Sequence, residues 1–185
     1  MRLLGTALVT CLLLLAPASA HAIEEYASYQ PPERCHTRPM PGTQVLARWV
    51  ARHHDGYVGT VRPCGRKKRV TSDHQAGRAV DWSANVRSRA DRREVRDLLR
   101  TLFAADGRGN PDAKARRMGI AYVIWNDEIY EAWRGFEPAP YLNSGCKRIT
   151  KCSPTLRHRD HVHISLSRDG ARGETSWYDG RLSER

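Results

Sequence analysis

The spacing of apolar residues along the chain predicts two well-defined helices. Over residues 44–54, apolar side chains recur at helical spacing on one face, with Thr43 placed to cap the first turn and Gly56 to end the helix. A longer helix is predicted over residues 91–105, and its apolar side chains form one continuous stripe. The residues of that stripe are Val95, Leu98, Leu99, Leu102 and Phe103. A third, short helix is expected to follow the Asn-Pro pair at 110–111.

Alternation of apolar and polar residues predicts several strands. The segment 161–167 alternates most regularly, and residues 120–125 and 128–133 form a second pair of strands joined by a turn at 126–127. A weaker strand is expected at 57–62. Helices and strands follow no regular strand–helix rhythm, and the strands are joined by short turns and long loops. The predicted fold class is therefore α+β, with a mainly antiparallel sheet and flanking helices.

The N-terminus has the pattern of an export signal. Arg2 precedes an apolar run over residues 3–15, which is too short to span a membrane. Small-x-small cleavage patterns follow at residues 18–20 and 20–22. We expect residues 1–22 to be a signal peptide and residues 23–185 to be a single secreted or envelope domain without a membrane span.

The cysteines agree with export. One of the five, Cys11, lies in the predicted signal peptide. The four that remain are an even number in an oxidising compartment, which predicts two disulfides with three possible pairings. Sequence proximity alone favours Cys35–Cys64 and Cys146–Cys152.

The chain is strongly basic, with a formal net charge of +11. A basic exported protein is attracted to anionic polymers, although the same charge also serves general solubility. The basic run at residues 66–69 directly precedes a polar motif that begins at residue 72. This position favours a role in attracting a substrate.

That motif contains His74 and Asp81 on either side of Gly77. Seven residues of helix would rise about 10.5 Å, a long span for two side chains that meet at one ion. A glycine turn followed by a short strand would bring them together. Taken alone, a surface histidine in a loop would be the commoner explanation of His74.

A second motif lies about eighty residues further on. Asp160 precedes His161 and His163, and period two places both imidazoles on one face of the predicted strand. With His74 and Asp81, they supply what one catalytic zinc ion needs. These requirements are three nitrogen or oxygen ligands, an open position for water and a nearby base.

The two motifs resemble those of the zinc peptidases of the D-alanyl-D-alanine carboxypeptidase group. This group includes the VanY-type enzymes and is related to lysostaphin-like peptidases and to the hedgehog signalling domain. The matching pattern is Ser72-x-His74-x-x-Gly77-x-Ala79-x-Asp81, followed by Asp160-x-x-His163. Residues 159–165 are especially similar to exported actinobacterial members. The similarity extends over residues 69–178, whereas the N-terminal third matches less clearly.

The resemblance implies a hedgehog-like or D-Ala-D-Ala-peptidase-like fold and a role for each motif residue. His74, Asp81 and His163 match the ligands of one zinc ion per chain. Asp160 matches the general base of the carboxypeptidase branch. His161 matches the first histidine of the His-x-His motif in the lysostaphin-like branch.

Two further residues are implied as substrate contacts. Ser72 matches a position at the substrate end of the cleft, and Arg62 is our candidate for the arginine that these enzymes use upstream of the first motif. Val162 stands where the family pattern has an aromatic residue. That difference affects how the substrate would be held.

The sequence therefore predicts an exported, monomeric zinc metallopeptidase that hydrolyses peptide stems or cross-links of peptidoglycan, as a carboxypeptidase or an endopeptidase. A zinc-bearing binding module without turnover is an alternative, as the hedgehog relationship indicates. A secreted nuclease is a weaker alternative, suggested by the charge and the histidines. The chain contains no phosphate-binding loop or nuclease metal motif, so no specific nucleic acid partner is expected.

Overall fold

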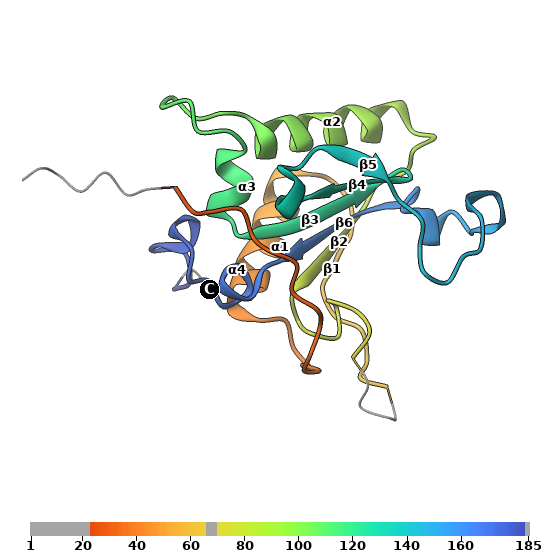
Figure 1. Ribbon diagram of the computed structural model, residues 1–185, viewed down its shortest axis with the longest axis horizontal. Helices are drawn as coiled ribbons and strands as arrows, with labels where there is room; N and C mark the ends of the chain where they lie inside the picture. Colours follow the sequence, from red (N-terminus) through yellow and green to blue (C-terminus); the bar gives the residue numbers. More distant parts are fainter. Residues whose placement is uncertain (1–22, 66–69, 184–185) are drawn as a thin grey trace, which may run out of the picture.

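The computed structural model describes residues 23–65 and 70–183, and its centre is a six-stranded sheet in the order β1-β2-β6-β3-β4-β5 (Figure 1). Each neighbouring pair of strands is antiparallel. The predicted α+β fold class with a mainly antiparallel sheet is confirmed. The strands are β1 (Val58–Gly59), β2 (Ala79–Ser83), β3 (Ile120–Trp125), β4 (Glu128–Glu131), β5 (Pro138–Pro140) and β6 (His161–Leu166).

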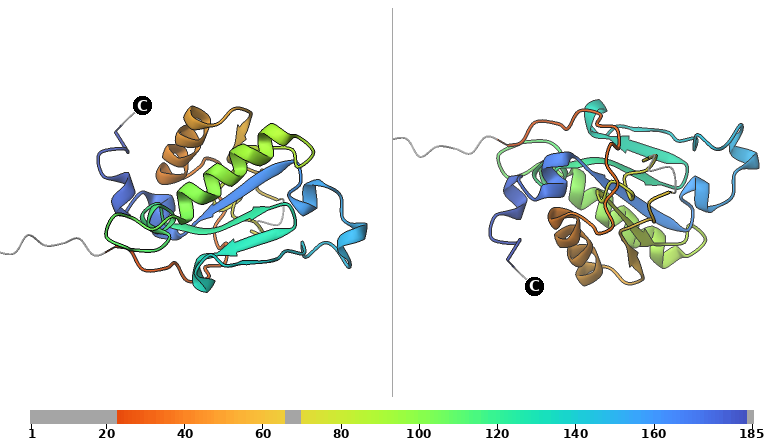
Figure 2. Two further views of the ribbon diagram at one scale, coloured as in Figure 1. Left: turned by 90° about the horizontal axis from the view of Figure 1, so that it is seen from above. Right: turned by 90° about the horizontal axis from the view of Figure 1, so that it is seen from below.

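Helices cover one face of this sheet. Figure 2 shows α1 and α2 on the same side, with the N-terminal segment on the other. The apolar side chains of β2 and β6 point toward the helices, where Val80, Ile164 and Leu166 are completely buried. The helices are α1 (Pro41–His53), α2 (Arg89–Phe103), α3 (Ala113–Arg117) and α4 (Arg168–Arg172). Short 3-10 helices are η1 (Ala132–Arg134), η2 (Ile149–Lys151), η3 (Thr155–Arg157) and η4 (Ser176–Tyr178).

The long helix α2 begins two residues before its predicted start. The hydroxyl oxygen of Ser88 accepts a hydrogen bond from the backbone N–H of Asp91 at 3.2 Å, which caps the first turn. Val95, Leu98 and Leu102 are fully buried, and the other two residues of the predicted stripe pack partly against the core. The apolar stripe therefore identified the buried face correctly.

The first helix begins three residues earlier than predicted, at Pro41, because a proline fits the first turn of a helix. Thr43 is not its cap. The Thr43 side chain is buried and its hydroxyl donates to the carbonyl oxygen of Gly77 at 2.8 Å. This bond fixes helix α1 to the loop that carries the first polar motif.

Three predicted elements differ from the structure. The strand expected at 57–62 is reduced to β1, since only Val58 and Gly59 pair with β2. Strand β4 ends at Glu131, where η1 begins. The long loop expected at 135–157 contains β5, which pairs with β4 and extends the sheet.

Both disulfides have the pairing that sequence proximity favoured. Cys35–Cys64 joins the N-terminal segment to the loop after β1, and Cys146–Cys152 closes a short loop before β6. Two disulfides are compatible with a secreted protein. Within residues 23–65 and 70–183, no helix is long and apolar enough to cross a membrane. The predicted signal peptide and the basic run at 66–69 lie outside the described residues.

Candidate metal centre

Residues from two distant motifs meet on the sheet face opposite the helices. Asp81 on β2 is paired directly with His163 on β6. His74 comes from the turn before β2, which reverses at Gly77 with a φ of +69°, a conformation that favours glycine. One ligand atom from each of the three side chains lies within 4.8 Å of the others. We call this trio the metal-binding group.

The geometry within the group is compact. Nε2 of His74 lies 3.0 Å from Oδ2 of Asp81, and Nδ1 of His163 lies 2.8 Å from Oδ1. The two imidazole nitrogens are 3.2 Å apart. Two imidazoles and one carboxylate are a common protein ligand set for zinc in catalytic sites. The residues therefore fit a divalent metal ion.

Each imidazole is held from behind by a further group. Nδ1 of His74 lies 3.2 Å from the carbonyl oxygen of Thr60, and Nε2 of His163 lies 2.9 Å from Oγ of Ser165. When His74 donates its Nδ1–H to Thr60, the lone pair of Nε2 faces the group. The sequence analysis predicted no group that supports either imidazole. Ser165 could have been found from the period of two on β6, but a backbone carbonyl has no sequence signal.

The charges of the group suit a cation. Burial by itself raises the pKa of Asp81, but hydrogen bonds from His163 and His74 outweigh it and hold the pKa well below its usual range. Burial lowers the pKa of the His163 imidazole, although Asp81 opposes this. Both shifts favour the forms that metal binding requires, an ionised Asp81 carboxylate and a neutral His163 imidazole.

His161 lies beside the group, with Asp160 behind it. Nδ1 of His161 is 2.7 Å from Oδ1 of Asp160. Nε2 is buried, lacks a hydrogen-bond partner among the described residues and lies 3.8 Å from Oδ1 of Asp81. Asp160 accepts a second hydrogen bond from Thr155 at 2.5 Å and borders a different pocket from His74 and His163. Of the two predicted catalytic residues, His161 is the one that faces the metal-binding group.

A pocket of about 220 Å³ is bordered by His74 and His163 of this group, and Asp81 borders a neighbouring pocket that shares His74 and Arg62. Ser72 and Arg62 both line the first of these pockets, so the structure brings both predicted substrate contacts to the site. Oγ of Ser72 accepts a hydrogen bond from the N–H of His74, and the exposed Arg62 reaches to 3.9 Å from Asp81.

His158 is a pocket residue that sequence reasoning missed. Its side chain is buried, and Nδ1 has no hydrogen-bond partner within the described chain. Burial, followed by the nearby His163 and His161, lowers the pKa of His158 to about 3, so this imidazole is neutral. Its position three residues before the His-x-His pair could have indicated that it lies in the same pocket.

Tyr122 and Asp73 were also missed. The ring of Tyr122 stacks on that of His163, with centroids 5.6 Å apart and an interplanar angle of 22°. Its hydroxyl donates to Asp73 at 2.8 Å, and Asp73 forms a buried ion pair with Arg78 at 2.6 Å. Tyr122, anchored through Asp73 to Arg78, therefore packs directly against the His163 ring.

Comparison with known proteins identifies the family of this chain. The model of the VldE C-terminal domain matches residues 35–148, which is more than half of the chain. The chain belongs to the VldE C-terminal domain family. No curated protein and no solved structure matches it. The match to the VldE C-terminal domain includes Arg62, His74 and Asp81 and ends before β6, which contributes His161 and His163.

Proposed function

We propose that the protein is an exported zinc-dependent peptidase that hydrolyses peptide bonds of peptidoglycan stems or cross-links. The observation that carries this proposal is the convergence of His74, Asp81 and His163 next to Nε2 of His161, a nitrogen with no partner in the described part of the chain. A site that only stored a metal ion would not need a buried imidazole nitrogen without a partner. The resemblance of the two sequence motifs to zinc peptidases supplies the reaction class.

A zinc ion bound by this group would act as a Lewis acid and lower the pKa of a bound water toward about 7. The protein's own contribution is proton transfer. With Nδ1–H of His161 donated to Asp160, Nε2 is free to accept a proton from the attacking water and to return it to the leaving amine. Asp160, itself held by Thr155, fixes the tautomer and orientation of His161. In this scheme His161 is the base and Asp160 is a positioning residue.

Other pocket residues would hold the substrate. Arg62 carries a fixed positive charge at the mouth, suited to a substrate carboxylate or to negative charge that develops on the peptide oxygen. His158 is neutral and can donate one hydrogen bond from whichever ring nitrogen carries its proton. Both disulfides support a secreted or envelope location, and we propose peptidoglycan as the partner of a monomeric enzyme with one zinc ion per chain.

The test is mass spectrometry of peptidoglycan fragments after incubation with the zinc-loaded protein. Peptidase activity predicts new fragments whose masses identify the bond cut, and their loss in His163→Ala. A zinc-loaded protein that binds these fragments but leaves them unchanged would instead support the binding-module alternative. Nicking of plasmid DNA, abolished in His163→Ala, would favour the nuclease alternative.

A further inference from the structure

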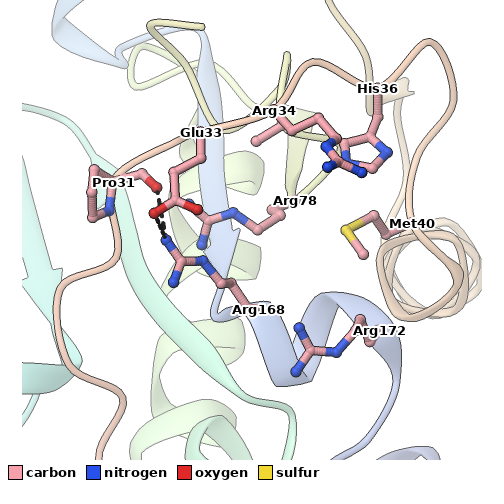
Figure 3. Close-up of a pocket in the computed structure, with 9 residues that line it drawn as sticks. Pro31, Glu33, Arg34, His36, Met40, Arg78, Arg168 and Arg172 are labelled. Carbon is pink, nitrogen blue, oxygen red and sulfur yellow. Dashed lines mark hydrogen bonds and ion pairs between the residues drawn. The ribbon is translucent and has the colours of Figure 1, made fainter.

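A second cavity, of about 250 Å³, lies behind the metal centre and is bordered by arginine side chains (Figure 3). Asp73 lines the metal-centre pocket and Arg78 lines this cavity, so their buried ion pair stands between the two. The lining includes four arginines and one acidic residue, Glu33. The arginines are Arg34, Arg78, Arg168 and Arg172, and they come from the N-terminal segment, the turn before β2 and helix α4.

Arg78 is the inner group of the cavity, and its side chain is only 4% exposed. Its guanidinium donates to the carbonyl oxygens of Leu166 and Gln30 and to the carboxylate of Asp73. These are three hydrogen bonds, whereas a guanidinium has five N–H donors. Two donors of a buried cation therefore have no partner among the residues that the structure describes. A buried cation with unused donors next to a cavity is suited to an anion.

The remaining three arginines lie at the rim, and none of them is buried. Arg34 is exposed and has no ion-pair partner within residues 23–65 and 70–183. Arg168 pairs with Glu33, with side chains 40% and 65% exposed, and Arg172 pairs with Asp169 and Glu174. Exposed ion pairs contribute little to stability, so an incoming anion can compete with Glu33 for Arg168. Figure 3 shows the side chains of Arg34, Arg168 and Arg172 arranged around that of Arg78.

We propose that this cavity binds one phosphate or carboxylate group of an anionic ligand. The planar fork of arginine matches both oxyanions in a bidentate geometry, and several arginines from different segments can surround one such group. The cavity is smaller than the roughly 300–1,000 Å³ of pockets for drug-sized ligands, so it suits a single anionic group, either a small anion or one unit of a polymer. Met40 and Ala76 complete the wall on the apolar side.

The proposal does not depend on peptidase activity, so its test uses binding alone. The disulfide-bonded protein is titrated by calorimetry with inorganic phosphate and separately with succinate, at constant ionic strength maintained with sodium chloride. The variants are Arg34→Ala/Arg168→Ala, which removes two rim cations, and Arg100→Ala/Arg134→Ala. The control pair carries two exposed arginines that form i,i+3 ion pairs elsewhere on the surface. Arg78 is left intact because its removal would leave the buried carboxylate of Asp73 without its cationic partner.

We expect saturable binding that the rim variant weakens by roughly 10-fold or more, since each lost charge-assisted hydrogen bond is worth that much. The control variant should bind like the wild type. Saturation by phosphate alone assigns the site to phosphate-bearing ligands, and saturation by succinate alone assigns it to carboxylates. Binding that is absent for both anions, or that is equal in all three proteins, overturns the proposal.

Discussion

His161 and His163 stand two residues apart on β6, yet their surroundings differ. His163 is buried and contacts Asp81, His74 and Ser165. His161 has one nitrogen on Asp160 and the other without a partner among the residues that the structure describes. At the residue scale, this difference in hydrogen bonding is the basis for proposing His163 as a metal ligand and His161 as a proton acceptor.

The first prediction concerns metal content. His163→Ala removes one of three ligands, so we expect the purified variant to hold far less than one zinc ion per chain. Elemental analysis after dialysis against dilute zinc measures this. His53→Ala, an exposed histidine on α1, is the matched control and should retain one ion. Full zinc occupancy in His163→Ala would contradict the ligand assignment.

The second prediction separates the base from its support. His161→Ala should keep zinc and lower peptide hydrolysis by roughly 10²–10⁴-fold, the usual size of general-base assistance. Asp160→Asn should keep zinc and cause a smaller loss, since the amide oxygen can still accept the Nδ1–H of His161. Steady-state kinetics on one soluble peptide compares them. A larger loss in Asp160→Asn than in His161→Ala would assign the base to Asp160.

At the element scale, the two disulfides close loops of different length around the site. Cys146–Cys152 spans six residues of sequence and Cys35–Cys64 spans 29. In the chain-entropy description, loops of these lengths correspond to about 2 and about 3.5 kcal/mol of unfolding free energy. The shorter loop lies in the segment before β6 that also includes His158.

The third prediction follows from that difference. Cys146→Ser/Cys152→Ser should accelerate hydrogen exchange in residues 141–158 while β3 and β6 stay protected, because this disulfide restrains only a local segment. Cys35→Ser/Cys64→Ser is the comparison and should lower the midpoint of urea unfolding more. Increased exchange throughout the sheet in the first variant would show that its loop supports the whole fold.

Gly42 allows α1 to approach α4 closely, and Gly170 allows α4 to approach the turn before β3. A Cβ atom added at Gly42 would lie 2.0 Å from the carbonyl oxygen of Gly170, and one added at Gly170 would lie 2.7 Å from that of Gly119. The obstructing atoms belong to the backbone, so they cannot rotate away. Helix α4 follows β6 directly and carries Arg168 and Arg172.

The fourth prediction is that Gly42→Ala destabilises the protein by about 1–3 kcal/mol through overpacking, which denaturant unfolding would measure. Gly107→Ala is the control, since an added Cβ there meets nothing within 4 Å. Equal stability of the two variants would mean that α1 can move away from α4 without cost.

At the scale of the whole molecule, positive charge gathers next to the metal-centre pocket. The segment between Glu137 and Asp160 contains no acidic residue. Lys147, Arg148 and Lys151 in its disulfide-closed loop are exposed and have no ion-pair partner within the described chain. The same segment supplies pocket residues from Tyr141 to His158. Figure 1 shows it projecting beyond the edge of the sheet.

The fifth prediction concerns attraction to the wall. Binding to intact peptidoglycan should weaken as salt rises, because salt screens the attraction between exposed charges. The Debye length is about 8 Å at physiological ionic strength and becomes shorter at higher salt. Lys147→Ala/Lys151→Ala should bind less and depend less on salt, which cosedimentation measures. Hydrolysis of a small uncharged peptide should be unchanged in this variant. A parallel loss of that hydrolysis would place the lysines in the active site.

The chain's local patterns were sufficient for much of the fold. Period two along 161–167 predicted β6, which ends one residue earlier, and the common face of His161 and His163, and β3 has its predicted bounds. Period 3.6 identified the buried face of α2. Such patterns are readable because a side chain's direction follows from the repeat of its own element. Termini were less predictable, as α1 and β1 illustrate, since they depend on partners elsewhere in the chain.

Tertiary structure alone decided how the site is built. Thr60 and Ser165 support the two imidazoles, and Asp160 contacts His161. Arg78 and Asp73 separate two cavities. These contacts join different strands and loops. Residue types and spacing indicated one metal site among His74, Asp81, His161 and His163, and the family resemblance selected His74, Asp81 and His163 as its ligands. They could not specify which atoms face one another. That depends on the β2–β6 register and on the turn at Gly77, which form only when the sheet and its helices bury their apolar faces together.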